Sequence, residues 1–183
     1  MAPEEILFAA DVLPVRITGT GEPLQQADLH VPPNSCPFAR SCLDAGMRGH
    51  YDYLDGVVVP NTCDITFSME YFWKTLVSRP AKPALVAGVD IEPFVHYLSC
   101  PEKVVGREVL IYYLEVLKDF KQEVERSLNR AISDDDLARA VAAYNADKVQ
   151  MKRMYEMRKS DPPALSGHEV WRITYAGLLM PKD

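Results

Sequence analysis

The sequence has few cysteines, and none of them pair at the spacing of a familiar metal or redox motif. The four are Cys36, Cys42, Cys63 and Cys100, and no two are separated by only two residues. The C-x-x-C spacing of a zinc ribbon or a thioredoxin-type dithiol is therefore absent. Because disulfides are rare inside cells, we expect each thiol to be a packing residue, a metal ligand or a reactive group.

Long apolar runs and basic clusters are also missing. No stretch approaches the roughly 20 apolar residues of a membrane-spanning helix. The first residues carry Glu4 and Glu5 instead of the basic start of a signal peptide. The net charge is -6, and no run of lysine or arginine offers a surface for nucleic acid. We expect a cytoplasmic protein that binds neither membranes nor nucleic acids.

The expected strands indicate an α/β fold. Leu13–Ile17 and Leu54–Pro60 are predicted strands, and the unbroken apolar run within the second is typical of a parallel strand covered on both faces. Ala84–Val89 is a third candidate, and the segment from Asp90 to Pro101 is predicted to be a loop. We therefore expect a Rossmann- or flavodoxin-like parallel sheet followed by a helical segment.

Predicted helices alternate with these strands and then replace them. They cover Glu4–Ala10, Pro37–Ala45 with Gly46 as its stop, Asp64–Val77, and three helices after Glu102, the last two capped by Ser133 and Ser166. The expected division is an α/β domain at residues 1–101 and a helical segment at residues 102–183. That segment is expected to lead to a second α/β half that this chain lacks.

Cys36 and Cys63 share a predicted setting, because each follows an extended segment and opens a helix. In an open α/β sheet such positions lie at the carboxyl edge of the strands, where ligands bind. A helix N-terminus supplies free N–H groups that favour a thiolate and can stabilise an anionic iron–sulfur cluster. Plain packing remains the alternative for both thiols, since cysteine is among the most buried residue types.

The other candidate ligands give weaker signals. Cys42 lies within the helix that Cys36 opens and is interpreted as a packing residue, whereas Cys100 is either a helix cap, a packing residue or a ligand. The four histidines show no helical pairing with one another or with a carboxylate that would suggest zinc. A small zinc-stabilised domain is thus a third hypothesis without paired cysteines to support it.

Several segments, in order along the chain, resemble the 2-hydroxyacyl-CoA dehydratase and benzoyl-CoA reductase subunit family. They are APEEILFAADVLPVRI (Ala2–Ile17), CPFARS (Cys36–Ser41), YLDGVVVPNTCD (Tyr53–Asp64) and ISDDDLARAVAAYN (Ile132–Asn145). The combination is specific, although no single segment is. Two departures stand out: Asp11 replaces a glycine found in many members, and Phe67 replaces an arginine.

The resemblance implies that Cys36 and Cys63 are two of three cysteine ligands of a [4Fe–4S] cluster. It implies an enzyme subunit that reduces a CoA thioester by one electron to a ketyl radical, in a dehydratase or an aromatic acyl-CoA reductase. The implied partners are a homologous second subunit, an ATP-dependent iron–sulfur activator and the acyl-CoA. The alternative is a non-catalytic scaffold subunit of the same heterodimer. No catalytic residue beyond the ligands is assigned.

Overall fold

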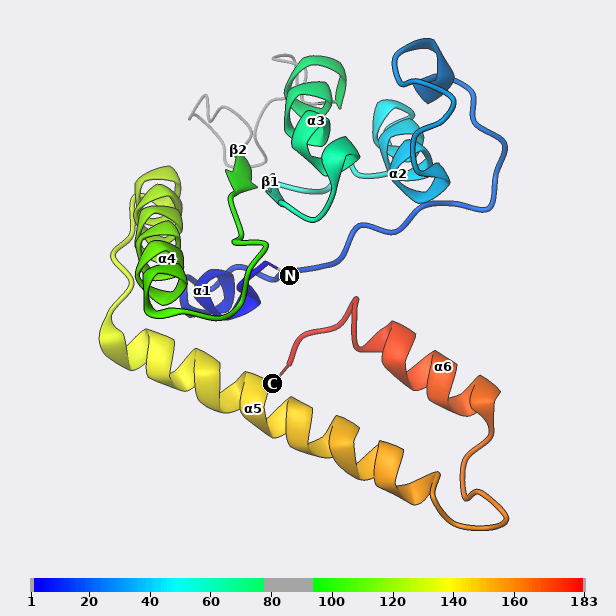
Figure 1. Ribbon diagram of the computed structural model, residues 1–183, viewed down its shortest axis with the longest axis vertical. Coiled ribbons are helices and arrows are strands. Elements are labelled where there is room, and N and C mark those ends of the chain that lie inside the picture. The colour runs from blue at the N-terminus through cyan, green and yellow to red at the C-terminus, as the bar shows by residue number, and fades with distance from the viewer. Residues whose placement is uncertain (1, 78–93, 183) are drawn as a thin grey trace. The chain divides into compact units, whose positions relative to one another are not determined.

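The computed structural model describes residues 2–77 and 94–182 of the chain (Figure 1). Contacts group the chain into two units. The first consists mainly of Ile17–Glu123, and the second combines Pro3–Arg16 with Val124–Asp183. Whether residue 101 is a domain boundary of the full protein stays a prediction.

The first unit contains a parallel two-stranded sheet. Strand β1 (Gly56–Pro60) pairs in parallel with β2 (Phe94–Leu98), in a register that sets Gly56 opposite Phe94 and Pro60 opposite Leu98. Between them along the chain lies α3 (Asp64–Phe72), which continues as a π-helical segment, η2 (Trp73–Val77). Two parallel strands with a helix in their connection form a β–α–β arrangement, so the predicted α/β class is confirmed.

The strand predictions had mixed outcomes. β1 begins two residues later than predicted. The predicted loop at 90–101 is wrong in part because it contains β2, whose aromatic and β-branched residues favour a strand despite the nearby prolines. The predicted strand Leu13–Ile17 is also wrong. This segment forms no ladder, and the N–H of Arg16 instead donates to the carbonyl of Leu178 (3.1 Å). The strand predicted at 84–89 lies outside the described residues.

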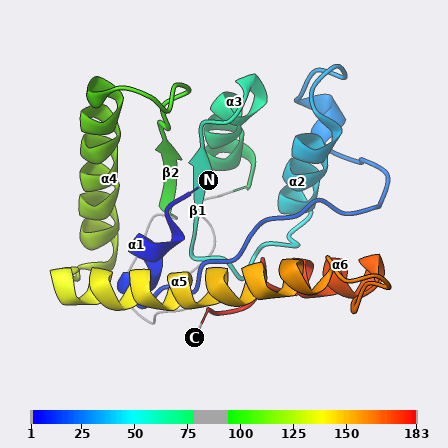
Figure 2. The ribbon, with the colours of Figure 1, turned by 60° about the horizontal axis from the view of Figure 1, so that its bottom comes forward.

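Helix α2 (Pro37–Met47) packs beside α3 (Figure 2), and the core of the first unit draws side chains from both helices and from β1. The buried side chains of this core are Ala27, Val31, Ala39, Leu43, Val57, Val59, Met69 and Trp73. Gly46 was predicted to end α2, but the helix continues through it. A Cβ atom there would lie 3.1 Å from Trp73 and Val77, so this glycine permits close helix packing and does not stop the helix.

Helix α4 (Arg107–Leu128) has the apolar periodicity expected from the sequence. Phe120 and Val124 are buried, and the Phe120 ring lies 5.0 Å from the His96 ring of β2. The His96 side chain is partly buried, and this burial lowers its pKa.

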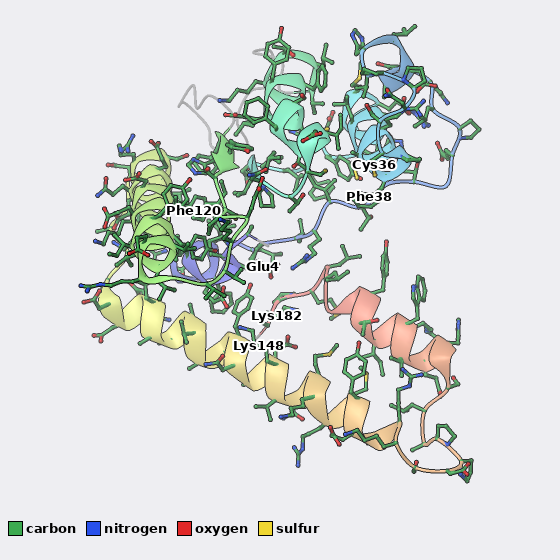
Figure 3. The ribbon with its side chains drawn as sticks, in the orientation of Figure 1. Glu4, Cys36, Phe38, Phe120, Lys148 and Lys182 are labelled. Carbon is green, nitrogen blue, oxygen red and sulfur yellow. The ribbon has the colours of Figure 1, made fainter. Side chains whose placement is uncertain are left out.

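The second unit is built on α5 (Asp134–Met157), with α1 (Glu4–Ala9) packed against it and α6 (Gly167–Ala176) following it. Phe8 meets Tyr144 edge to face at 5.8 Å, and Lys148 pairs with Glu5 at 3.2 Å. Figure 3 shows Glu4, Lys148 and Lys182 gathered in this unit. The caps predicted at Ser133 and Ser166 are confirmed, and each forms a capping box with the residue three positions later.

The backbone conformation of Asp11 shows why a glycine would suit this position, where the sequence is expected to depart from the family it resembles. Its φ is 58°, in the left-handed region that favours glycine, and it follows the C-cap of α1. Arg130 forms an ion pair with the Asp11 carboxylate and donates to the Ala10 carbonyl (3.2 Å), contacts that help an aspartate occupy this position.

No helix within residues 2–77 and 94–182 is long and apolar enough to cross a membrane.

Candidate functional site

Cys63 lies just beyond the carboxyl end of β1. The N–H of Asn61 donates to the carbonyl of Leu98 at 2.9 Å, which ties the end of β1 to the end of β2. Two residues later Cys63 is the N-cap of α3, with extended backbone and an exposed side chain. The structure therefore places this thiol at the carboxyl edge of the parallel sheet, as predicted from the sequence.

Thr66 holds Cys63 through a capping box. Its hydroxyl oxygen accepts the N–H of Cys63 (3.1 Å) and that of Thr62 (3.1 Å), while the Thr66 N–H faces the Cys63 side chain. The hydrogen bond from this N–H is the main reason why the pKa of the Cys63 thiol lies below its usual value. Cys63 is thus an exposed thiol whose thiolate form is stabilised, as a metal ligand or nucleophile requires.

Cys36 opens α2 in the same way that Cys63 opens α3. It is the N-cap, Pro37 follows at the first helical position, and the Cys36 carbonyl accepts the N–H of Arg40 (3.1 Å). The side chain is exposed and makes no capping hydrogen bond to the helix. It is therefore available to bind a ligand. Figure 3 shows Cys36 and Phe38 close together at one end of α2.

The two thiols lie at the same end of the α2–α3 pair. Gly46, near the end of α2, packs against Trp73 and Val77, at the far end of α3 and in η2. Helix α2 also contacts the body of α3, so the two helices run in the same direction. Their starts therefore lie on the same side of these contacts. Cys36 precedes Gly46 by ten residues, and Cys63 precedes Trp73 by ten. Equal helical rises therefore bring both N-termini to one end of the first unit.

A buried carboxylate also anchors the segment that leads to Cys36, a role that was not predicted from the sequence. Asp44 on α2 is only 2% exposed, and its Oδ1 accepts the N–H groups of Gln25, Gln26 and Ala27 at 2.8, 2.6 and 3.0 Å. Burial alone would raise the pKa of Asp44, but these three hydrogen bonds outweigh it and hold the pKa below its usual value. Helix periodicity could mark Asp44 as buried but could not name these partners.

The other two cysteines occupy different settings. Cys42 is buried, and burial followed by the proximity of Cys36 raises the pKa of its thiol to about 11, as suits a packing residue. Cys100 follows β2, is partly exposed, and donates its N–H to the Leu98 carbonyl (2.9 Å). Cys100 thus lies just beyond the same edge of the sheet as Cys63, and its role as a cap, a packing residue or a ligand stays a prediction.

Exposed aromatic rings flank both candidate ligands. Phe38, two residues after Cys36, is 60% exposed, and Phe67, four residues after Cys63, is 68% exposed. The Phe67 ring meets Tyr97 of β2 edge to face at 5.6 Å. Apolar side chains beside the two thiols can exclude water from them when another surface covers the aromatic rings. Within the described ranges, no three His, Cys, Asp or Glu side chains cluster closely enough to hold a metal ion.

Comparison with known proteins shows the family. The family model described as "2-hydroxyglutaryl-CoA dehydratase, D-component" matches residues 1–183, the whole chain. The chain therefore belongs to this family of CoA-thioester enzymes, which confirms the resemblance seen in its motifs. The structure adds two exposed cysteines at helix N-caps, one of which, Cys63, lies at the carboxyl edge of the parallel sheet.

The individual relatives have low sequence identity to this chain and are longer than it. The chain is 26% identical to a subunit of the benzoyl-CoA reductase of Thauera aromatica over 99% of its own length and 44% of the relative's. It is 24% identical to the (R)-phenyllactyl-CoA dehydratase beta subunit of Clostridium sporogenes, over 86% of its length and 43% of the relative's. For the beta subunit of the (R)-2-hydroxyglutaryl-CoA dehydratase of Acidaminococcus fermentans the identity is 20%, over 99% and 45%. The chain thus spans less than half the length of these relatives, all of which are named as subunits.

Proposed function

We propose that this chain is the part of an acyl-CoA dehydratase or benzoyl-CoA reductase-type subunit that supplies Cys36 and Cys63 as two ligands of a [4Fe–4S] cluster. One observation carries the proposal. Two exposed cysteines each occupy the N-cap position of a helix, and the two helices begin at the same end of one unit. Family membership supplies the reaction class, because the relatives are named for reductase and dehydratase reactions of CoA thioesters.

The residues present suit such a group. Thiolates are the usual ligands of iron–sulfur clusters, and N–H groups directed at sulfur stabilise the cluster's negative charge. Cys63 has that N–H contact from Thr66, and Cys36 stands at a helix start where unpaired N–H groups are available. The two thiols form a partial ligand set, so the proposal assigns the remaining ligation to a part of the protein beyond this chain.

The chain's own residues would bind the cluster and shield it from water. Cys36 and Cys63 would hold the cluster, Thr66 would favour the thiolate form of Cys63, and Phe38 and Phe67 would limit the access of water. When bound, the cluster would supply a low-potential electron to a CoA thioester, which yields a ketyl radical anion. The proposed partners are the acyl-CoA, a homologous second subunit and an ATP-dependent iron–sulfur activator.

The proposal is tested by anaerobic iron and acid-labile sulfide analysis of the full-length protein. We expect the cysteine-dependent absorbance of an iron–sulfur cluster, and its loss in both Cys36→Ala and Cys63→Ala. Cys42→Ala is the matched control, because this third thiol lies close to Cys36 but is buried, and it should retain iron. Full iron content in the first two variants, with subunit association intact, would refute the proposal and favour the non-catalytic scaffold subunit.

A further inference from the structure

Helix α2 holds the chain segment that precedes it. Ser41 accepts the N–H of Thr20 and donates to the carbonyl of the same residue, both at 2.9 Å. Asp44 receives the three converging N–H groups at residues 25–27. Side chains that project from the helix thus fix the segment near its start and at its middle.

Arg40 adds a third attachment, nearer to Cys36. Its guanidinium pairs with Asp28 and donates to the carbonyl of Pro33 at 2.9 Å, three residues before the thiol. The N–H of Arg40 also donates to the Cys36 carbonyl, as the first turn of the helix requires. The backbone of Cys36 is therefore held from both sides, by the helix that it opens and by the anchored segment that enters it.

Asp44, the central anchor, contributes more to the path of the chain than to the burial of apolar surface. An apolar residue at position 44 would fill the same space at little desolvation cost, whereas a buried carboxylate is stable only when donors converge on it. Three N–H groups reach a single oxygen of Asp44, and Arg48 approaches the other oxygen at 3.6 Å. This arrangement admits one path of the segment at residues 25–27, and hence one direction of entry toward Cys36.

We propose that Asp44 and Arg40 are positioning residues that preorganise Cys36 as a metal ligand. This inference rests on the proposed function, because it assumes that Cys36 and Cys63 bind one metal centre together. If a ligand thiol occupies its binding position only part of the time, the apparent metal affinity falls to that fraction of its full value. If removal of the Asp44 carboxylate leaves the segment in place about one tenth of the time, metal affinity falls about tenfold.

The test uses Cd²⁺ alone as the thiol-binding probe, titrated into this chain under reducing, anaerobic conditions. The sulfur-to-cadmium charge-transfer absorbance gives the Kd. Cys36→Ala and Cys63→Ala first establish that both thiols contribute. We then expect the Kd to rise about tenfold in Asp44→Ala, and less in Asp44→Asn, which keeps an oxygen acceptor. Hydrogen exchange at the amides of residues 25–27 should quicken in the same order.

Two further variants complete the experiment. Arg40→Gln removes only the attachment at Asp28 and Pro33, so it tests the inference if Asp44→Ala fails to fold, and we expect a severalfold rise in Kd. Asp55→Asn changes an exposed acid in the same unit and should leave the Kd unchanged. Wild-type Kd values in folded Asp44→Ala and Arg40→Gln would overturn the positioning role but leave the proposed function intact. Absence of thiol-dependent Cd²⁺ binding in the unaltered chain would overturn the shared site that both proposals assume.

Discussion

Cys36 and Cys63 occupy matching positions but are held by different means. Cys63 is fixed locally, because its partner Thr66 lies three residues away in the same helix turn. Cys36 is fixed at a distance, because the segment that leads to it is anchored by residues of α2 up to 21 positions away in the sequence. A cysteine at a helix start can therefore be held by one short motif or by a network of side chains along a helix, here Arg40, Ser41 and Asp44 of α2.

The difference determines how each thiol responds to mutation. A local cap adds a modest amount of stability and mainly tunes the ionisation of its own thiol. A buried, fully satisfied carboxylate stabilises both the fold and a path of the chain, so its loss affects both together. Three substitutions separate these two effects, and their expected changes decrease from Asp44 through Gly46 to Thr66.

Asp44→Ala should be the most damaging change. It leaves three N–H groups without their acceptor next to the core, and we expect the free energy of unfolding to fall by about 3 kcal/mol. Urea denaturation followed by circular dichroism measures this loss. A change below about 1 kcal/mol would show that water or another group replaces the carboxylate, and the contrast between the two thiol settings would then disappear.

Gly46→Val tests the alignment of α2 with α3 that brings the two thiols to one end. The new side chain would collide with Trp73 and Val77, and we expect a loss of about 2 kcal/mol in the free energy of unfolding together with weaker Cd²⁺ binding. Gly21→Val is the matched control, because a Cβ at Gly21 meets no atom within 4 Å. Equal effects of the two substitutions would contradict the alignment.

Thr66→Val should act on one thiol only. The variant keeps the shape of the side chain but loses the hydroxyl that accepts the Cys63 N–H, so stability should fall by about 1 kcal/mol. The pKa of Cys63 should rise slightly, because the variant loses the lesser, side-chain hydrogen bond of Thr66 to the thiol but keeps the backbone N–H that contributes most. Alkylation rates measured against pH, with each cysteine quantified by mass spectrometry, should therefore shift to higher pH for Cys63 and stay unchanged for Cys36. A shift at both thiols would contradict the local nature of the cap.

The sequence predicted the local features of the site and not the distant ones. The two helix starts at Cys36 and Cys63 and the buried strand between them were predicted from short patterns, because caps and prolines act on adjacent residues. The anchoring role of Asp44 was not predictable, since its partners lie in a bend that leads into the short 3-10 helix η1 (Ala27–Leu29), where the sequence shows no periodicity. Gly46 was misread for a related reason: a helix-ending glycine and a glycine that admits a neighbouring tryptophan look the same until the neighbour is known.

The anchored segment before α2 also bears on which sequence changes evolution can accept there. Surface loops usually tolerate insertions and deletions, but this one is attached to α2 at residue 20, at residues 25–27 and at residue 33. Length variation among homologues should therefore concentrate at residues 21–24, because the interval after residue 28 holds the core residue Val31. The interval from Pro33 to Cys36 should keep a constant length, as though it were part of the helix that follows it.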